Sequence, residues 1–285
     1  MTNLKIALQK SGRLNEDSIK LLKECGISIN NGKDQLMAQA SNFPLEVLYL
    51  RNADIPQYVR DGVADIAVIG DNTEIEKETG IVNLLDLGFS KCRLSIAVPK
   101  SADFQDISWL QGKRIATSYP NSLRKFLAAN KLEAEIHEIS GSVEIAPNIG
   151  LADAICDLVS TGSTLFKNGL KEVYKMFDSQ AVLFANPNLS AEKKAILDQL
   201  IFRINSVLIS KSNKYILLNA PEKALDEICS LLPGMRSPTI IPLQRKGWVS
   251  VHAVVNENKF WEVIDNLRNA GAEGILIIPI EKMIL

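Results

Sequence analysis

The stretch "GLADAICDLVSTGSTL" at residues 150–165 repeats the pattern of an earlier stretch, "GVADIAVIGDNTEI" at residues 62–75. Each begins with Gly-x-Ala-Asp, continues as an apolar run typical of a buried strand, and ends in a polar loop that opens a helical pattern. "KIALQKSGRL" (5–14) and "RIATSYPNSL" (114–123) form a second pair in the same order along the chain. A unit that occurs twice predicts two similar α/β lobes facing a cleft; the alternative is a chance similarity of short α/β segments.

Strand and helix patterns alternate through the first two-thirds of the chain. Short apolar runs predict strands at 5–8, 45–50 and 66–69. Amphipathic or Pro-initiated patterns predict helices at 16–25 and 55–61. This alternation predicts a mainly parallel sheet with helices on both faces. The run "CRLSIAVPK" at 92–100 is expected to be the strand that crosses between the lobes.

The C-terminal third changes character. Its patterns predict a strand, a helix, an antiparallel strand pair, a second helix and a last strand, at 214–220, 221–234, 239–243, 248–255, 257–271 and 275–280. This is the βαββαβ order of a ferredoxin-like domain. The segment has no obvious catalytic cluster. Small domains of this shape often bind regulators or mediate assembly, which is an analogy at the level of the fold.

The composition is that of a globular protein with a substantial core. The 285 residues are 46% hydrophobic, and the length favours two or three domains. There are 32 Lys and Arg against 33 Asp and Glu, which argues against a nucleic-acid-binding protein but not against a local basic pocket. The N-terminus resembles no signal peptide and no window is long enough for a membrane span, so we expect a cytoplasmic protein with no membrane partner.

Cysteine and histidine usage narrows the chemistry. The four cysteines are far apart and form no CxxC pair, which predicts free thiols in a reducing compartment: Cys25, Cys92, Cys156 and Cys229. The two histidines are His137 and His252. With so few histidines, the sequence gives little support for a His-rich zinc site or a Ser-His-Asp triad.

The hydroxyl-rich loop Ser160–Thr164 is the strongest candidate site. It follows a predicted parallel strand, and ligands of open α/β folds bind at the carboxyl ends of such strands. A helix starting near Thr164 would offer unpaired N–H groups, and four hydroxyls surround one glycine there, which predicts a phosphate site. The alternative is that Ser160 or Thr161 is only a helix N-cap.

Asp157 lies inside the apolar run that leads into this loop. A carboxylate repels a phosphate, so we expect Asp157 to face ribose hydroxyls or a magnesium ion. The alternative is an ion pair with a basic residue at the sheet edge. Asp153 is a weaker candidate, because Ala-Asp before a strand is often a turn or a cap.

Three further loops could contact a ligand. "QKSGRL" (9–14) places a glycine between Lys10 and Arg13 ahead of a helix; it is not a Walker A loop, and the alternative is a solvated turn. "GDNTE" (70–74), the counterpart of the hydroxyl-rich loop, is acidic, so the two lobes would hold chemically different ligand parts. "TSYPNSL" (117–123) offers Tyr119 for stacking. Arg51 is a further basic candidate, whose alternative role is a surface ion pair.

A wider set of motifs resembles the long-form ATP phosphoribosyltransferases, the first enzymes of histidine biosynthesis. Their order and coverage of nearly the whole chain carry the resemblance: "LQKSGRL", "LRNADIP", "GVADIAVIG", "GKRIATSYPN", "GSVEIAPNIGLADAICDLVSTGSTL", "LLPGMRSPTI" and "GAEGILIIPIEKM". The resemblance implies an α/β protein with a two-lobed catalytic core like the periplasmic-binding-protein type II fold and a C-terminal ferredoxin-like (ACT-like) regulatory domain. It also implies catalytic lobe I at 1–93 and 182–210, catalytic lobe II at 94–181 and the regulatory domain at 211–285, in chains that form dimers and hexamers.

The resemblance implies the site residues as well. The phosphoribosyl pyrophosphate site, with Asp157 as its catalytic residue, would comprise Asp153, Asp157, Ser160, Thr161, Gly162, Ser163 and Thr164. The site for ATP or the product would comprise Lys10, Ser11, Gly12, Arg13, Arg51, Asp71, Asn72 and Tyr119. The inhibitor L-histidine would bind the regulatory domain at Met235, Ser237, Thr239 and Gly274. The chain departs from the family pattern at Asn148, where related sequences often carry Arg.

The implied reaction is attack by an adenine ring nitrogen of ATP on the anomeric carbon of phosphoribosyl pyrophosphate, with Mg²⁺ held mainly by substrate phosphates. A ring nitrogen needs no strong base, which fits a chain with two histidines. Two other classes share the bilobed fold. A secreted solute-binding protein would need a signal peptide and would not explain the C-terminal domain. A ligand-sensing regulator usually carries a basic DNA-binding helix pair, and none is apparent.

Overall fold

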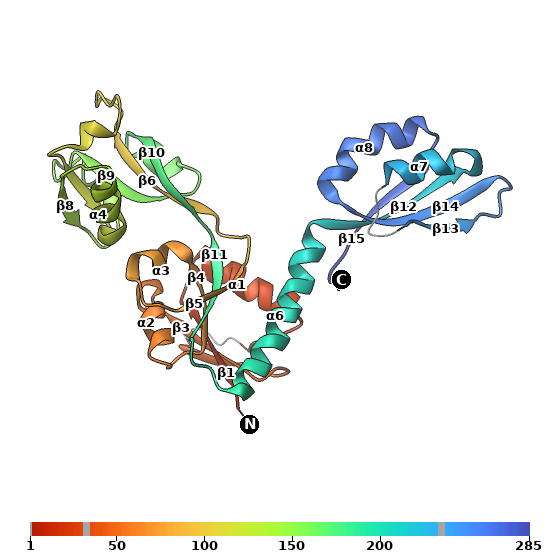
Figure 1. Cartoon of the computed structure of the whole chain (residues 1–285), viewed down its shortest axis with the longest axis horizontal. Coiled ribbons are helices and arrows are strands. Elements are labelled where there is room, and N and C mark those ends of the chain that lie inside the picture. The colour runs from red at the N-terminus through yellow and green to blue at the C-terminus, as the bar shows by residue number, and fades with distance from the viewer. Residues whose placement is uncertain (1, 31–34, 233–236) are drawn as a thin grey trace. The chain divides into compact units, whose positions relative to one another are not determined.

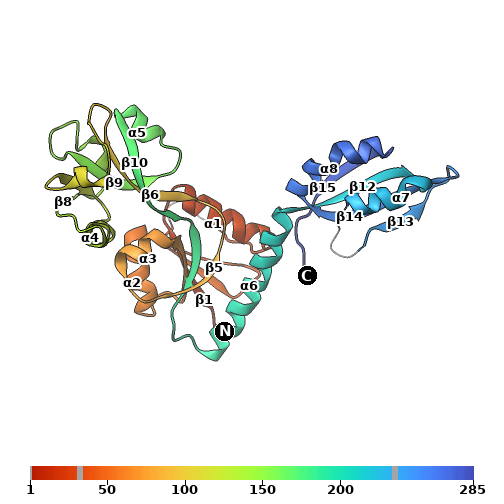
Figure 2. The ribbon, with the colours of Figure 1, turned by 45° about the horizontal axis from the view of Figure 1, so that its top comes forward.

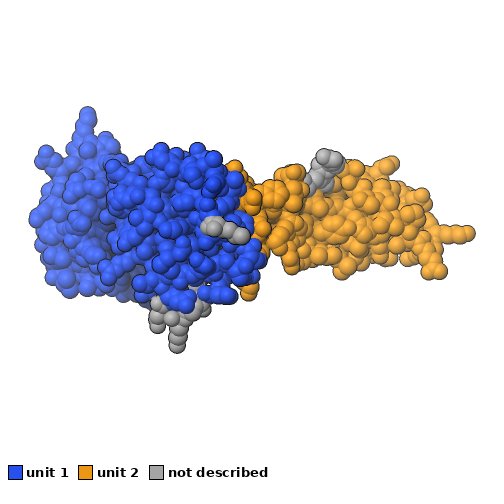
Figure 3. Space-filling model, turned by 90° about the horizontal axis from the view of Figure 1, so that it is seen from below, with its two compact units in different colours: residues 1–20, 27–196 blue, residues 21–26, 197–285 orange. Residues whose placement is uncertain are grey.

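The computed structural model describes residues 2–30, 35–232 and 237–285. Two compact units divide the chain, one made of residues 1–20 and 27–196, the other of residues 21–26 and 197–285 (Figure 3). The first unit contains two of the three sheets, and the second contains the third. None of the helices in the described ranges is long and apolar enough to cross a membrane.

A six-stranded sheet and its helices form lobe I of the first unit. The strand order is β2-β3-β1-β4-β11-β5. The strands are β1 (Leu4–Gln9), β2 (Met37–Gln39), β3 (Leu45–Leu50), β4 (Ile66–Gly70), β5 (Val82–Asp86) and β11 (Ala181–Ala185). The helices are α1 (Arg13–Glu24), α2 (Ile55–Arg60) and α3 (Asp71–Lys77), with a 3-10 turn η1 (Asn52–Asp54). Helix α6 (Ala191–Lys211) begins in the first unit, and its residues from 197 onward belong to the second unit. Ile6, Ala7 and Leu8 of β1 are fully buried, as expected for a central strand covered on both faces.

A five-stranded sheet forms lobe II of the same unit. The strand order is β10-β6-β9-β7-β8. Its elements are β6 (Cys92–Pro99), η2 (Ile107–Leu110), β7 (Arg114–Thr117), α4 (Pro120–Ala129), β8 (Glu135–Glu138), η3 (Val143–Ile145), β9 (Ala154–Val159), α5 (Ser163–Lys167) and β10 (Leu170–Ser179). The adjacent residues Ile115 and Ala116 are fully buried in two different apolar clusters. Because neighbouring side chains of a strand point to opposite faces, both faces of this sheet are covered.

The backbone pairing confirms the repeat predicted from the sequence. β1 runs parallel to β4, and β7 runs parallel to β9. In lobe I the N–H of Lys5 donates to Asp65 Oδ2 at 2.8 Å, and the N–H of Asp65 donates to the Lys5 carbonyl at 2.9 Å. In lobe II the same two bonds join Arg114 and Asp153, at 3.0 and 2.8 Å. Each Gly-x-Ala-Asp aspartate therefore joins the amino end of its strand to the neighbouring strand.

The prediction of a mainly parallel sheet is wrong, because both sheets are mixed. β3, β1 and β4 are parallel, as are β8, β7 and β9, but β2, β5, β6, β10 and β11 pair antiparallel. The last four of these strands adjoin the two places where the chain passes between the lobes, at 87–91 and at Gln180 (Figures 1 and 2). The strand predicted to cross lies as β6 wholly in the second sheet, since it pairs with β10 on one side and β9 on the other.

The second unit contains a four-stranded antiparallel sheet in the order β13-β14-β12-β15. Its elements are β12 (Asn213–Pro221), η4 (Glu222–Ala224), α7 (Leu225–Leu231), β13 (Thr239–Pro242), β14 (Trp248–Asn256), α8 (Glu257–Asn269) and β15 (Glu273–Pro279). Ile228 of α7 and Phe260 and Leu267 of α8 share one apolar core with the sheet, so both helices cover the same face (Figure 1). This confirms the predicted βαββαβ order.

Candidate active site

The carboxyl ends of β1 and β3 form a basic edge of lobe I. The two strands are parallel, with Gln9 paired to Leu50. Lys10 and Arg51 therefore follow at neighbouring positions, and both side chains are exposed. The N–H of Lys10 donates to the Leu50 carbonyl at 2.8 Å, which continues the pairing by one residue. The structure thus brings two predicted cationic residues together.

The loop after β1 holds the rest of that predicted group. Ser11, Gly12 and Arg13 are exposed. Gly12 has a φ of 91°, a conformation that disfavours residues with a side chain. Arg13 Nε lies 3.8 Å from the carboxylate of Asp17, one turn along α1, and the Arg13 side chain is 74% exposed. Such an exposed pair is weak, so Arg13 stays available to an anion.

Asp71 and Asn72, at the start of α3, lie where the lobes join. Asp71 Oδ1 accepts hydrogen bonds from the N–H of Asn72 at 2.8 Å, the N–H of Gln180 at 3.1 Å and the Ser179 hydroxyl. The Ser179 hydroxyl also lies 2.8 Å from Asn72 Oδ1. A Cβ on Gly70 would lie 2.2 Å from Asn72 Oδ1, so any larger residue there would displace the Asn72 side chain. Asp71 therefore joins α3 to the segment that crosses between the lobes.

Two side chains of α3 contact lobe II directly. Asn72 Nδ2 donates to the Tyr119 hydroxyl at 3.3 Å. The carboxylate of Glu76, a residue 5% exposed, accepts from the N–H groups of Asn121 and Ser122, both at 2.8 Å. The Ser122 hydroxyl adds a third bond at 2.7 Å. A carboxylate is favourable at a helix N-terminus, so a side chain of lobe I caps α4 of lobe II.

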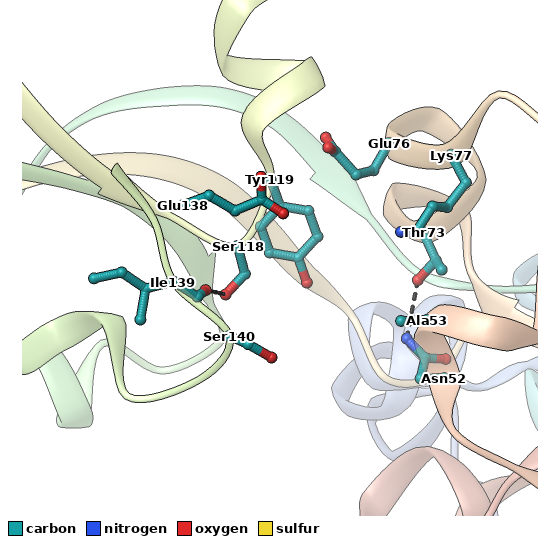
Figure 4. Close-up of a pocket in the computed structure, with 10 residues that line it drawn as sticks. All are labelled: Asn52, Ala53, Thr73, Glu76, Lys77, Ser118, Tyr119, Glu138, Ile139 and Ser140. Atoms are coloured by element: carbon teal, nitrogen blue, oxygen red, sulfur yellow. Dashed lines mark hydrogen bonds between the residues drawn. The ribbon is translucent and has the colours of Figure 1, made fainter. Parts of the chain in front are cut away.

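A cavity of about 590 Å³ opens beside this contact (Figure 4). Lobe I lines it with residues that follow β3 or belong to α3: Asn52, Ala53, Thr73, Glu76 and Lys77. Lobe II faces them with residues at the ends of β7 and β8: Ser118, Tyr119, Glu138, Ile139 and Ser140. The cavity therefore lies at the carboxyl ends of parallel strands, where open α/β sheets bind ligands. Its volume suits a ligand of nucleotide size.

Of the residues that line this cavity, the candidate loops at 70–74 and 117–123 contain Thr73, Ser118 and Tyr119, and only Tyr119 was singled out by itself. The rule that ligands bind at the carboxyl ends of parallel strands applies to β8 as well as to β7, and it would have found Glu138. Glu76 lies farther along the helix and carries no such signal, because its role depends on the approach of the second lobe.

The hydroxyl-rich loop follows β9 as predicted. Helix α5 begins at Ser163, after Gly162 with a φ of 76°. Ser160, Thr161, Ser163 and Thr164 are all exposed. The Thr161 hydroxyl lies 3.1 Å from that of Ser163 and accepts a long hydrogen bond, at 3.4 Å, from the Ser163 N–H. A helix of five residues has little dipole, so the loop offers an anion chiefly its exposed hydroxyl and N–H donors.

Asp157 lies in β9, two residues before the strand ends. Burial raises the pKa of its carboxyl to about 6; the N–H of Leu158, which donates to Oδ1 at 2.8 Å, opposes this shift, and the charge of Glu144 adds to it. Burial, and after it the charge of Asp157, also raises the pKa of the Tyr119 hydroxyl. Within the described ranges Asp157 forms no ion pair, so the alternative of a basic partner at the sheet edge is wrong.

Asp153 lies at the opposite end of β9. Arg114 Nε and Nη2 donate to its two carboxylate oxygens at 3.2 and 2.8 Å. These hydrogen bonds, with that from the Arg114 N–H, lower the pKa of Asp153 to about 2. A six-residue strand is roughly 20 Å long. The structure therefore does not place Asp153 with the Ser160–Thr164 loop, and it gives this aspartate an architectural partner.

Two of the predicted regulatory residues, Thr239 and Gly274, lie on opposite edges of one sheet. Met235 is outside the described residues. Ser237 is exposed just before β13, Thr239 is the first residue of β13, and Gly274 lies in β15. β13 and β15 are the two edges of the sheet, with β14 and β12 between them. Strands about 4.8 Å apart place Gly274 roughly 14 Å from Thr239, too far for one small ligand within one sheet.

Side chains that could bind a metal do not cluster in the described parts of the chain. No group of three or more His, Cys, Asp or Glu that could hold a metal occurs among the residues described. Mg²⁺ commonly takes one or two carboxylates and completes its shell with water and substrate phosphates. Asp157, near the phosphate-type loop, fits such a supporting role.

Two family models match the sequence. The one described as ATP phosphoribosyltransferase matches residues 51–206, and the one described as the HisG C-terminal domain matches residues 210–282. The ATP phosphoribosyltransferase of Cytophaga hutchinsonii is 58% identical over 283 residues, which are 99% of this chain and 99% of that protein.

Solved structures give the same picture at the level of the fold. A chain of the ATP phosphoribosyl transferase (HisG:HisZ) complex from Thermotoga maritima aligns with a TM-score of 0.64 and 29% identity, over 72% of this chain and 98% of that one. The substrate binding protein of an amino acid ABC transporter aligns with a TM-score of 0.50 and 12% identity, over 73% of this chain and 94% of that one. The second likeness shows the fold alone, and it confirms the predicted two-lobed core.

Proposed function

This chain belongs to the ATP phosphoribosyltransferase family, and we propose that it transfers the phosphoribosyl group of phosphoribosyl pyrophosphate to an adenine ring nitrogen of ATP. The products are phosphoribosyl-ATP and pyrophosphate, in the first step of L-histidine biosynthesis. The observation that carries this conclusion is the 58% identity to an ATP phosphoribosyltransferase over nearly the whole of both chains. The cavity between the lobes and the hydroxyl-rich loop that follows β9 offer the reaction a place.

The two lobes would hold different parts of the substrates. The exposed hydroxyl and N–H donors of Ser160–Thr164 suit the 5′-phosphate of the phosphoribosyl donor. Lys10, Arg13 and Arg51, on the carboxyl edge of lobe I, would supply positive charge to the phosphates of ATP or of the product. Tyr119 lines the cavity from lobe II and would pack against the adenine.

Catalysis would rest on positioning and electrostatics. An adenine ring nitrogen is mostly unprotonated at neutral pH, so its attack needs no strong general base. Positive charge develops on the sugar as the bond to pyrophosphate breaks, and the ionised Asp157 would stabilise that charge or orient the ribose hydroxyls. Mg²⁺, with Asp157 as a supporting ligand, would neutralise charge on the pyrophosphate. Closure of the lobes would exclude water from the reacting groups.

The C-terminal domain would bind L-histidine as a feedback inhibitor. Ser237 and Thr239 on one edge, Gly274 on the other and the undescribed Met235 are the candidate contacts. A single histidine could meet both edges only if a second copy of the domain completed the site. That requirement agrees with the proposed homo-oligomer, a dimer or hexamer.

The proposed domain boundaries follow the family pattern. Catalytic lobe I comprises 1–93 and 182–210, catalytic lobe II comprises 94–181, and the regulatory domain comprises 211–285. A biosynthetic reaction that consumes ATP and phosphoribosyl pyrophosphate supports the proposal that the enzyme is cytoplasmic.

Pyrophosphate release tests the proposal. The protein is incubated with ATP, phosphoribosyl pyrophosphate and MgCl₂, and release should require both substrates. Addition of L-histidine should slow it. An absence of release would remove the proposed activity, whereas release that histidine leaves unchanged would keep the enzyme and remove the feedback role.

A further inference from the structure

Arg93 joins the hydroxyl-rich loop to two strands of lobe II. It lies in β6, paired with Val159 at the end of β9. Its Nε donates to Glu172 Oε1 at 2.6 Å, and its Nη2 donates to Glu172 Oε2, so the pair is bidentate. Its Nη1 donates to the carbonyl of Ser160, the first residue of the loop, at 3.1 Å. One guanidinium therefore connects β6, β10 and the loop.

The carboxylate of Glu172 is itself held in place. The hydroxyl of Ser95, a residue 1% exposed, donates to Glu172 Oε1 at 2.8 Å. Hydrogen bonds from Arg93 and then from Ser95 lower the pKa of Glu172. The guanidinium charge is thus balanced by a fixed carboxylate. Arg93 therefore serves the loop as a hydrogen-bond donor to its backbone, rather than as a charge that meets the ligand.

The bond to the Ser160 carbonyl fixes the orientation of a peptide plane. In a trans peptide the C=O of one residue and the N–H of the next point in opposite directions, and the described chain contains no cis peptide. With the Ser160 carbonyl directed at Arg93, the Thr161 N–H is directed away from it. We propose that Arg93 is a positioning residue that aims the Thr161 N–H at the phosphate of the phosphoribosyl donor. This inference rests on the proposed function of the loop.

A near copy of this arrangement at the other end of β9 provides a matched control. Arg114 makes the bidentate pair with Asp153, and its Nη1 donates to the Gly150 carbonyl at 2.9 Å. Gly150 belongs to no candidate site. Arg114→Lys therefore loses the same kinds of hydrogen bond as Arg93→Lys without touching the loop.

Steady-state kinetics of the two variants test the role of Arg93. Lysine keeps the charge but cannot serve both Glu172 oxygens and the Ser160 carbonyl together. Arg93→Lys should raise KM for phosphoribosyl pyrophosphate about tenfold, as expected for one misaligned hydrogen bond to a charged ligand, and change KM for ATP by less than about twofold. Arg114→Lys should change neither KM, although both variants should lower the melting temperature. Glu172→Gln should also raise KM for phosphoribosyl pyrophosphate and leave KM for ATP nearly unchanged. The double variant with Arg93→Lys should raise KM for phosphoribosyl pyrophosphate little beyond either single variant.

Each outcome separates this inference from the proposed function. If the wild-type protein releases no pyrophosphate, the proposed function fails before any variant is compared. If the wild type is active and Arg93→Lys raises both KM values, or neither, the positioning role is overturned. Should Arg93→Lys fail to fold, Glu172→Gln carries the same test, and equal KM values in that variant and the wild type would overturn the role.

Discussion

The two ends of β9 carry aspartates only four residues apart, and their environments are opposite. Asp153, at the amino end, accepts hydrogen bonds from Arg114, which lower its pKa to about 2. Asp157, toward the carboxyl end, is half-buried and has a pKa raised to about 6 by that burial. A paired acid stabilises the fold, whereas a buried acid without a cation destabilises it at neutral pH. Such an unfavourable acid, in a strand that leads directly into a donor-rich loop, indicates function.

The strand of lobe I that corresponds to β9, which is β4, has an aspartate at its amino end but none toward its carboxyl end. Asp65, with a side chain 5% exposed, accepts from the N–H of Lys5 at 2.8 Å and from Lys193 Nζ at 2.7 Å. The repeat places Ile69 where lobe II has Asp157, and Ile69 is fully buried. The Gly-x-Ala-Asp aspartate is therefore architectural in both lobes, and the acid inside the strand is specific to lobe II.

The largest expected effect is at the carboxyl end. Asp157→Asn should lower turnover about 100-fold or more, because it removes a preorganised charge from the transition state. ATP binding should be unchanged. Pyrophosphate release measures the first quantity and calorimetry with ATP the second. The matched control is Asp153→Asn, which should retain turnover. Near-normal turnover in Asp157→Asn would show that the two ends of β9 do not differ in function.

At the amino ends of the repeated strands, the expected effect is on stability. Asp65→Ala should lower the free energy of unfolding by on the order of 2–3 kcal/mol, because it leaves a partly buried lysine and a backbone N–H without their acceptor. Asp153→Ala should cost about 1 kcal/mol or less, since its pair with Arg114 is more exposed.

Urea unfolding measures both differences, and KM for phosphoribosyl pyrophosphate serves as the control. A higher KM for phosphoribosyl pyrophosphate in Asp153→Ala would show that Asp153 contributes to binding of that substrate. An equal loss of stability in the two variants would contradict the role of burial.

The pH dependence of stability also distinguishes Asp157 from the aspartates at the amino ends of the strands. Its pKa in the folded protein, about 6, lies above the ordinary value of 3.8, so its contribution to stability is present below about pH 4 and is lost as the pH rises through 6. Asp157→Asn should therefore be more stable than the wild type at pH 7–8, by on the order of 2 kcal/mol. The two proteins should converge near pH 4. Urea midpoints at pH 4, 6 and 8 check this, and a less stable variant at pH 8 would contradict it.

The sequence predicted the repeat and the hydroxyl-rich loop because both are local. Gly-x-Ala-Asp, an apolar run and a polar loop are contiguous, and the carboxyl end of a parallel strand identifies the loop as a ligand site. The βαββαβ order of the C-terminal domain was predicted for the same reason. The antiparallel pairing of β6 was not, since its neighbours β9 and β10 are set by the two crossings of the chain.

The rest of the site depends on contacts between distant segments. Arg93 is 67 residues from Ser160, and Glu76 of α3 caps α4 of the other lobe, so no local pattern indicates either role. The partner of Asp153 is 39 residues earlier in the chain. Asn148, the departure from the family pattern, donates to the Asn168 carbonyl at 3.0 Å, at the end of α5 and not at its ligand-facing start. Spatial proximity rather than composition decides these roles.

The smallest expected effect concerns Thr161 and decides between capping and binding. Thr161→Val removes the hydroxyl and keeps the shape of the side chain. The hydrogen bond that this hydroxyl accepts from the Ser163 N–H is long, at 3.4 Å, so the free energy of unfolding should change by less than about 0.5 kcal/mol. KM for phosphoribosyl pyrophosphate should rise about three- to tenfold through loss of one donor to the phosphate.

Thr161→Ser keeps the hydroxyl and is the matched control, with both quantities expected near the wild-type values. The opposite result is equally informative, because it would assign Thr161 to the structural residues and not to the ligand-binding ones. If Thr161→Val lowered stability by about 1 kcal/mol and left KM unchanged, its hydroxyl would be an N-cap. The loop would then begin to bind ligand only beyond Gly162, and Thr161 would belong with the architectural residues that Asp65 and Asp153 represent.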